Sequence, residues 1–176
     1  MATRRAALFA AVLATLLLAG ASEAPRARGA RPAAPAAPAR AGVELAIIVN
    51  KSNPNDNLSF SELREYFMAE RGNWPGGAGK VRVVMREPGV GEREAVLRLV
   101  YDMDEKGFNS YFLGKKFRGE ILEEPRLRSS TPDMIKTVAN LPGAIGYVRS
   151  EEVDASVKVL RVDGLAPGDA GYRIRQ

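Results

Sequence analysis

Val81-Arg82-Val83-Val84-Met85-Arg86-Glu87-Pro88-Gly89-Val90-Gly91-Glu92-Arg93 is the stretch that decides the fold, because it passes from a short apolar segment into a loop with two glycines. The next residues, 94–100, have the apolar spacing of a helix. A strand, a glycine loop and a helix in this order point backbone N–H groups and the positive end of a helix dipole at one place. Such a place suits an anion, and Arg86 and Arg93 would add positive charge. The stretch therefore predicts an α/β fold with a candidate anion site at the loop.

The segments before this stretch predict a strand and a helix. Residues 45–49 form a continuous apolar run, which is typical of a strand covered on both faces. Ser59 precedes Glu62 by three residues, the spacing of a capping box, and this predicts a helix that ends near Ala69. Two strands joined through a helix favour a parallel βαβ crossover between residues 45–49 and 81–85.

The segments after the loop predict three helices and two strands. Ser130 or Thr131 is expected to cap the last helix, with Pro132 in its first turn. Residues 121–128 are ambiguous, although Pro125 argues against a regular helix. The final strand is expected at a sheet edge because basic residues interrupt it. The expected helices cover residues 94–101, 104–113 and 133–140, and the expected strands cover residues 144–148 and 157–162. The order β-α-β-α-α-α-β-β predicts a single three-layer αβα domain.

The first 42 residues are expected to lie outside this domain. Arg4 and Arg5 precede an unbroken apolar run at residues 6–18, which is short for a membrane span, and small residues suited to cleavage follow it. These features predict a secretory signal peptide and a periplasmic or secreted protein, with an uncleaved anchor as the alternative. The Ala/Pro/Arg-rich residues that follow predict a mobile linker. The expected boundaries are signal peptide 1–24, linker 25–42, α/β lobe 43–165 and tail 166–176.

The composition excludes several classes of function. The chain has no cysteine and no histidine, so it has no disulfide, no Ser-His or Cys-His dyad and neither of the commonest zinc ligands. Six of the 26 Lys and Arg residues and one of the 21 Asp and Glu residues precede residue 41, which leaves 20 of each. The domain is therefore formally neutral, and no nucleic-acid partner is predicted. The cluster Lys115-Lys116-Phe117-Arg118 is interpreted as a solvated helix end. Pairs such as Glu92 with Glu94, or Glu123 with Glu124, are interpreted as solvated faces, so no enzyme, metal or cofactor is predicted.

Five short motifs occur in an order that resembles one protein family. They are Ile48-Val49-Asn50-Lys51-Ser52-Asn53-Pro54, Leu58-Ser59-Phe60-Ser61-Glu62-Leu63-Arg64-Glu65-Tyr66-Phe67, Asn73-Trp74-Pro75, the loop after Met85, and Leu141-Pro142-Gly143-Ala144-Ile145-Gly146-Tyr147-Val148. Over roughly residues 44–162 the chain resembles the phosphate-binding proteins of bacterial ABC importers, which implies the type II periplasmic-binding-protein fold. Family members have two α/β lobes with phosphate held between them. This chain resembles the second lobe alone.

The resemblance also implies ligand-binding residues in the loop. Family members hold phosphate there with an arginine and with the hydroxyls of a serine-glycine-threonine run at the helix start. Arg86 stands at the arginine position, whereas Val90 replaces the serine and Glu92 replaces the threonine. Both hydroxyls are lost, and a carboxylate about 4 Å from an anion repels it by roughly 1 kcal/mol in water and by more when partly buried. The candidate ligand-binding residues are Arg86, Gly89, Val90, Gly91, Glu92 and Arg93.

Two hypotheses about function follow from the loop. In the first, the chain is an exported solute-binding-like protein that binds phosphate or another small anion weakly and works with an ABC importer permease or another envelope protein. In the second, Glu92 substitutes for the lost ligand, paired with Arg86 or Arg93. The chain would then be a non-catalytic interaction or assembly module of the cell envelope, with an envelope protein or a second copy of itself, as a homodimer, for a partner.

Overall fold

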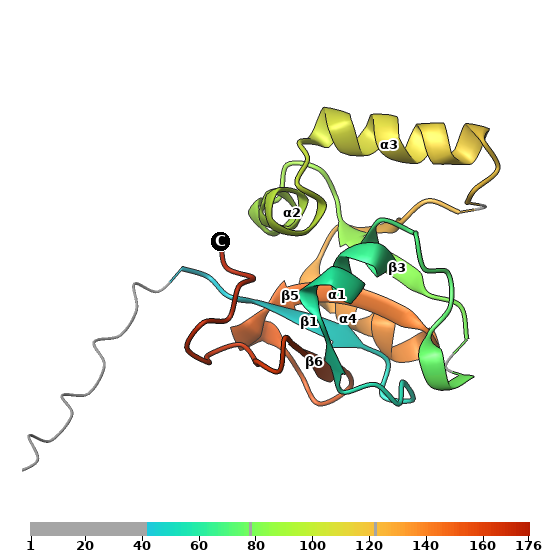
Figure 1. Cartoon of the computed structure of the whole chain (residues 1–176). Coiled ribbons are helices and arrows are strands. Elements are labelled where there is room, and N and C mark those ends of the chain that lie inside the picture. Colours follow the sequence, from blue (N-terminus) through green and yellow to red (C-terminus); the bar gives the residue numbers. More distant parts are fainter. Residues whose placement is uncertain (1–41, 78, 122) are drawn as a thin grey trace, which may run out of the picture. The chain divides into compact units, whose positions relative to one another are not determined.

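The computed structural model describes residues 42–77, 79–121 and 123–176, and the structural statements below refer to these residues. They form one six-stranded sheet in the order β2-β6-β1-β5-β3-β4 (Figure 1). The predicted signal peptide and nearly all of the predicted linker lie outside the described residues. The strands are β1 (Leu45–Val49), β2 (Asn57–Leu58), β3 (Arg82–Arg86), β4 (Arg126–Arg128), β5 (Ala144–Arg149) and β6 (Lys158–Val162).

Four α-helices and three short helical turns connect the strands. No helix within the described ranges is long and apolar enough to cross a membrane. The helices are α1 (Phe60–Phe67), α2 (Gly91–Val96), α3 (Glu105–Phe117) and α4 (Thr131–Asn140), and the turns are the 3₁₀ turns η1 (Pro75–Gly77) and η3 (Ser150–Glu152) and the π-helical turn η2 (Leu97–Tyr101).

The direction of the strands differs from the expected parallel crossover. β5 lies between β1 and β3, pairing with β1 in the antiparallel sense and with β3 in the parallel sense. β1 and β3 are therefore neither neighbours nor parallel, and the predicted βαβ crossover is wrong. The apolar runs of β1 and β5 are buried on both faces, which explains their composition, but an apolar run does not encode the direction of its neighbours.

The predicted edge position of the last strand is also wrong. β6 pairs with β1 on one side and with the two-residue β2 on the other. Its basic residues have other roles: Lys158 forms an ion pair with Asp56 at 2.8 Å, and Arg161 is exposed. The edge next to β3 is instead formed by β4, within the segment that was ambiguous in sequence.

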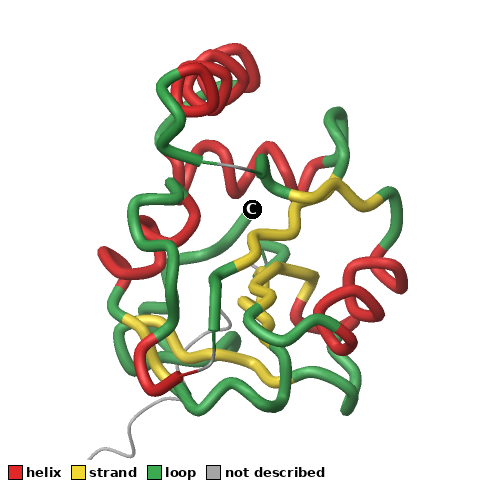
Figure 2. Tube along the Cα trace, turned by 90° about the vertical axis from the view of Figure 1, so that its right-hand side faces the viewer, coloured by secondary structure: helices red, strands yellow, loops and turns green. Residues whose placement is uncertain are grey.

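Helices cover both faces of the sheet, as the prediction of three layers requires (Figure 2). On one face, alternate residues of β1 pack with α1, α2, η2 and α3 in the larger hydrophobic cluster. On the other face, Ala46, Ile48 and Val84 pack with Met134 and Val138 of α4. The fold is thus the mixed α/β lobe that the sequence predicts.

Local signals located the N-caps of α1 and α4 correctly. Ser59 and Glu62 form the predicted capping box of α1, and the side chain of Ser130 accepts a hydrogen bond from the Asp133 backbone at the start of α4. The expected helix over residues 94–101 is divided into α2 and the π-helical turn η2, and α3 extends past its expected end.

The C-terminal residues, expected as a tail, are part of the folded domain. Tyr172 and Ile174 are almost fully buried in the larger hydrophobic cluster. The Leu45 N–H donates to the Ile174 carbonyl at 2.9 Å, and the Gln176 N–H donates to the Val43 carbonyl at 2.8 Å. The packed unit therefore extends beyond residue 165. The sequence gives only a weak signal for this packing, because only two apolar side chains of the segment are buried. They are two residues apart, as in an extended segment.

Candidate functional site

The anion loop, residues 86–93, connects the end of β3 to the start of α2. Gly89 has φ 84°, a left-handed conformation that favours glycine. At Gly91 a side chain would collide with the amide of Gln176, which lies against this position. Val90 occupies the N-cap and provides no side-chain hydrogen bond to the helix. The loop thus has the backbone form that the sequence predicts, and its cap lacks a hydroxyl.

Glu92 is buried at the start of α2, with an exposed fraction of 7%. Its Oε1 accepts a hydrogen bond from Nε of Arg149 at 2.5 Å. Burial opposes ionisation, yet the hydrogen bonds from its own backbone N–H and from Arg149 hold the pKa of Glu92 below its ordinary value of 4.5. Glu92 is therefore a carboxylate at neutral pH. It pairs with Arg149, whereas the sequence predicted a pair with Arg86 or Arg93.

Arg86 has unused hydrogen-bonding capacity. Its Nε and Nη1 atoms are buried and have no hydrogen-bond partner within the described part of the chain. Its backbone is held on both sides, because the Arg86 N–H donates to the Tyr147 hydroxyl at 3.1 Å and the Arg86 carbonyl accepts from Arg93 at 2.8 Å. The backbone of Arg86 is thus fixed by the sheet.

Arg93 faces α3 and serves the fold. It is 1% exposed, and its Nε and Nη2 donate to the two carboxylate oxygens of Glu105 at 2.8 and 2.7 Å. Its guanidinium also lies 4.8 Å from the centroid of the Phe108 ring. These contacts use most of its donors, so Arg93 connects the anion loop to α3.

Sequence reasoning missed Arg149, Tyr147 and Gln176 as neighbours of the loop. Arg149 directly follows the motif that ends at Val148, but nothing in the sequence indicates that it lies opposite Glu92, 57 residues away. The parallel pairing of β3 with β5 brings the ends of these strands together. Only knowledge of that pairing would have placed Arg149 at the loop.

The site as a whole has the components for holding an anion. Two guanidinium groups, Arg86 and Arg149, and the first turn of α2 provide positive charge, and the carboxylate of Glu92 neutralises part of it. Across the described ranges, no cluster of three or more carboxylate side chains could hold a metal ion. The chemistry open to this arrangement is electrostatic binding.

Comparison with known proteins gives partial relatives. No family model matches the chain. Two curated proteins, both named phosphate-binding protein PstS 2 and both from strains of Streptococcus agalactiae, are 34% identical over 90 residues, which are 49% of this chain and 27% of each relative. The chain therefore spans about a quarter of the length of these relatives.

Solved structures agree with this similarity. A phosphate ABC transporter substrate-binding protein from Clostridium perfringens, solved with bound phosphate, matches with a TM-score of 0.57 and 25% identity over 71% of this chain and 47% of that chain. An ABC-type phosphate transport receptor from Vibrio cholerae matches with the same TM-score and identity over 72% of this chain and 49% of that chain. The chain thus corresponds to about half of each solved structure.

Proposed function

We propose that the chain, which is similar over part of its length to phosphate-binding proteins of bacterial ABC importers, is an exported solute-binding-like protein whose anion loop is occupied by its own Glu92 carboxylate. The observation that carries this proposal is the ion pair between the buried Glu92 carboxylate and Arg149, at 2.5 Å. Its relatives are named as phosphate-binding and substrate-binding proteins, which supports a binding role.

An internal carboxylate reduces the affinity for an external anion in two ways. It occupies hydrogen-bond donors of the first turn of α2 and of Arg149, and it repels a second negative charge. A free anion would have to displace Glu92 or bind beside it. The unused N–H groups of Arg86 support weak binding beside Glu92, while the ion pair argues against tight binding.

Calorimetry on the exported, processed protein tests this function. Phosphate and sulfate, each titrated to millimolar concentration, should give weak binding that an Arg86→Gln variant abolishes. Arg98→Gln is the matched control, since Arg98 is an exposed arginine that lies outside the anion loop. Saturation of the wild-type protein at micromolar phosphate would contradict the proposed occupation of the loop by Glu92.

A second candidate function is an interaction module of the envelope. It is favoured by three exposed apolar side chains on α3 and β4: Leu113 is 52% exposed, Phe117 is 83% exposed and Leu127 is 43% exposed. Exposed apolar groups near one another are typical of protein contacts. Sedimentation of the wild-type chain and of a Leu113→Ser/Phe117→Ser variant tests self-association, because only the wild type should form dimers as concentration rises. Identical monomeric behaviour of both would remove support for a homodimer.

A further inference from the structure

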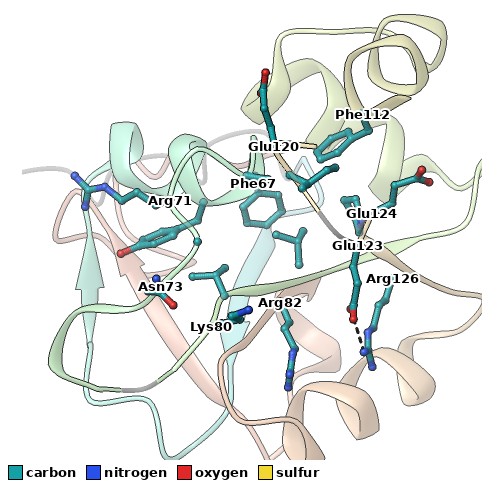
Figure 3. Close-up of a pocket in the computed structure, with 17 residues that line it drawn as sticks. Phe67, Arg71, Asn73, Lys80, Arg82, Phe112, Glu120, Glu123, Glu124 and Arg126 are labelled. Carbon is teal, nitrogen blue, oxygen red and sulfur yellow. Dashed lines mark hydrogen bonds and ion pairs between the residues drawn. The ribbon is translucent and has the colours of Figure 1, made fainter. Parts of the chain in front are cut away.

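A cavity of about 380 Å³ lies at the opposite end of β3 from the anion loop, but its aromatic lining is closed to a ligand (Figure 3). Phe67 and Phe112 are 0% and 2% exposed, because they pack within the larger hydrophobic cluster. At its rim, Arg126 forms an ion pair with Glu123 at 3.3 Å. An exposed polar side chain lies instead at the anion loop, where Gln176 reaches the start of α2.

The carboxamide of Gln176 lies directly against Gly91, the first residue of α2. Its Nε2, Cδ and Oε1 atoms are all within 4 Å of the position that a Cβ of Gly91 would occupy. Gly89 has a positive φ of 84°, whereas Gly91 does not have a positive φ. The backbone conformation therefore explains the glycine at position 89, and the close approach of Gln176 explains the glycine at position 91.

A second glycine makes room for the backbone of the same residue. A Cβ at Gly42 would lie 2.6 Å from the Gln176 carbonyl oxygen, and Gly42 also has no positive φ. The Gln176 N–H donates to the Val43 carbonyl at 2.8 Å. Two residues earlier, Ile174 is fully buried, and its carbonyl accepts from the Leu45 N–H at 2.9 Å. The backbone of Gln176 is thus held by the domain, and its side chain extends to the anion loop.

The Gln176 side chain is exposed and has unused hydrogen-bonding atoms. Within the described ranges, no group of the chain is hydrogen-bonded to its carboxamide. A primary amide provides two N–H donors and one carbonyl acceptor. Gly91 directly follows Val90, the N-cap whose side chain forms no cap hydrogen bond. A free neutral donor therefore lies next to the position where the loop lacks a hydroxyl.

Arg86 provides positive charge at the other end of the loop. It is partly exposed and forms no ion pair with any residue that the structure describes. Burial opposes the ionisation of Glu92, yet its backbone N–H, Arg149 and, to a smaller extent, Arg86 hold the pKa of Glu92 below 4.5. Arg86 therefore acts on the residue that follows Gly91, so the charge of Arg86 and the amide of Gln176 serve the same part of the loop.

We propose that Gln176 is a further anion-binding residue of the loop, and that its Nε2–H group donates to a small oxyanion held by the charge of Arg86. The amide takes the role of the hydroxyl donor that is absent at Val90. A hydrogen bond to a charged oxyanion is stronger than one between neutral groups, so a single amide contributes measurably to affinity. This inference rests on the function proposed for the loop, because it requires an anion there.

Nuclear magnetic resonance of the side-chain amide tests the contact directly. Gln176 is the only glutamine of the chain, so labelling with ¹⁵N-glutamine identifies its Nε2–H signals. Titration of the exported, processed protein with phosphate should shift these signals saturably, with the same midpoint as the heat of binding, and Arg86→Gln should abolish the shift. Heat of binding without a shift would overturn the role of Gln176 and leave the proposed function intact. The absence of both heat and shift would overturn both.

Matched variants separate a hydrogen-bond donor from a side chain that only fills space. Gln176→Met preserves the length of the side chain but removes its donors, and both this variant and Gln176→Ala should bind phosphate about tenfold more weakly than the wild type. Asn140→Ala, which removes an exposed amide at the end of α4, should bind like the wild type. Wild-type affinity in Gln176→Met, or a higher affinity in Gln176→Ala, would overturn the proposal, since the side chain would then fill or block the loop.

Discussion

Glu92 keeps its charge in a position where burial alone would favour the neutral form. The hydrogen bonds from its own backbone N–H and from Arg149 more than offset that burial, so its pKa is lowered. The arrangement is the intramolecular counterpart of an anion at a helix start. At this scale, the buried Glu92 carboxylate lies at the start of α2, where the helix dipole favours negative charge.

The lowered pKa of Glu92 makes the stability of the domain depend on pH. Since the folded-state pKa lies below the ordinary value of 4.5, the stabilising contribution is fully present above that value and is lost as the pH falls through the folded-state pKa. The difference in free energy of unfolding between the wild type and Glu92→Gln, measured with urea, should therefore shrink as the pH falls below 4.5. In an Arg149→Gln background the same difference should vary less. A difference that is constant with pH would contradict the ion pair.

Removal of Arg149 should leave the Glu92 carboxylate without its charged partner. We expect Arg149→Gln to lower the free energy of unfolding at neutral pH, because the Glu92 carboxylate is buried, although solvent screens the pair at the Arg149 side chain, which is 39% exposed. Lys116→Gln, which breaks an exposed pair with Glu124, is the control and should cost at most about 1 kcal/mol. Equal effects in the two variants would show that the Glu92 pair has no special role.

At the scale of elements, Arg93 connects the anion loop to α3. It contacts Glu105 at the start of α3, the Phe108 ring and the Arg86 carbonyl. The loop and the helix should therefore move together, since one buried side chain holds both.

Substitution of Arg93 should loosen α3 selectively. We expect Arg93→Met to lower the free energy of unfolding by about 2–4 kcal/mol, because it removes charge-assisted hydrogen bonds at a buried position. Hydrogen exchange should accelerate more in α3 than in α4, which packs on the other face of the sheet. Arg98→Met is the control at an exposed arginine. Uniform acceleration across the domain would contradict a local connection.

The elements show which features the sequence determines locally. The capping box at Ser59 and Glu62 and the cap at Ser130 depend on residues three apart, so the sequence predicted them correctly. Strand directions depend on which distant segments pair, and the sequence pattern of β1 was compatible with either direction. The same limit applies to the site: Arg86 and the glycines were identified from the loop itself, whereas Arg149 reaches Glu92 only through the pairing of β3 with β5.

At the scale of the whole domain, the C-terminal segment, residues 172–176, closes the larger hydrophobic cluster. The Tyr172 hydroxyl donates to the Leu45 carbonyl at 2.7 Å, and Ile174 is fully buried. Gln176 lies against Gly91. The segment therefore joins the first strand of the domain to the anion loop.

The C-terminal segment should contribute strongly to stability. Ile174→Ala is expected to lower the free energy of unfolding by about 2–4 kcal/mol, since it removes a fully buried aliphatic side chain. Arg173→Ala, at the exposed neighbouring position, should change it by at most about 1 kcal/mol. Chemical denaturation measures both. A negligible effect of Ile174→Ala would show that the segment does not remain packed in solution.

The most direct test of the central claim, that Glu92 takes the place of the ligand, is the phosphate affinity of a Val90→Ser/Glu92→Thr variant compared with that of the wild type. This variant restores both hydroxyls and removes the internal carboxylate while leaving Arg86 and both glycines of the loop unchanged. Titration calorimetry should show an increase in phosphate affinity of at least about tenfold, because the repulsion is removed and hydrogen-bond donors are gained. No gain in affinity, in a variant that is folded, would contradict the claim.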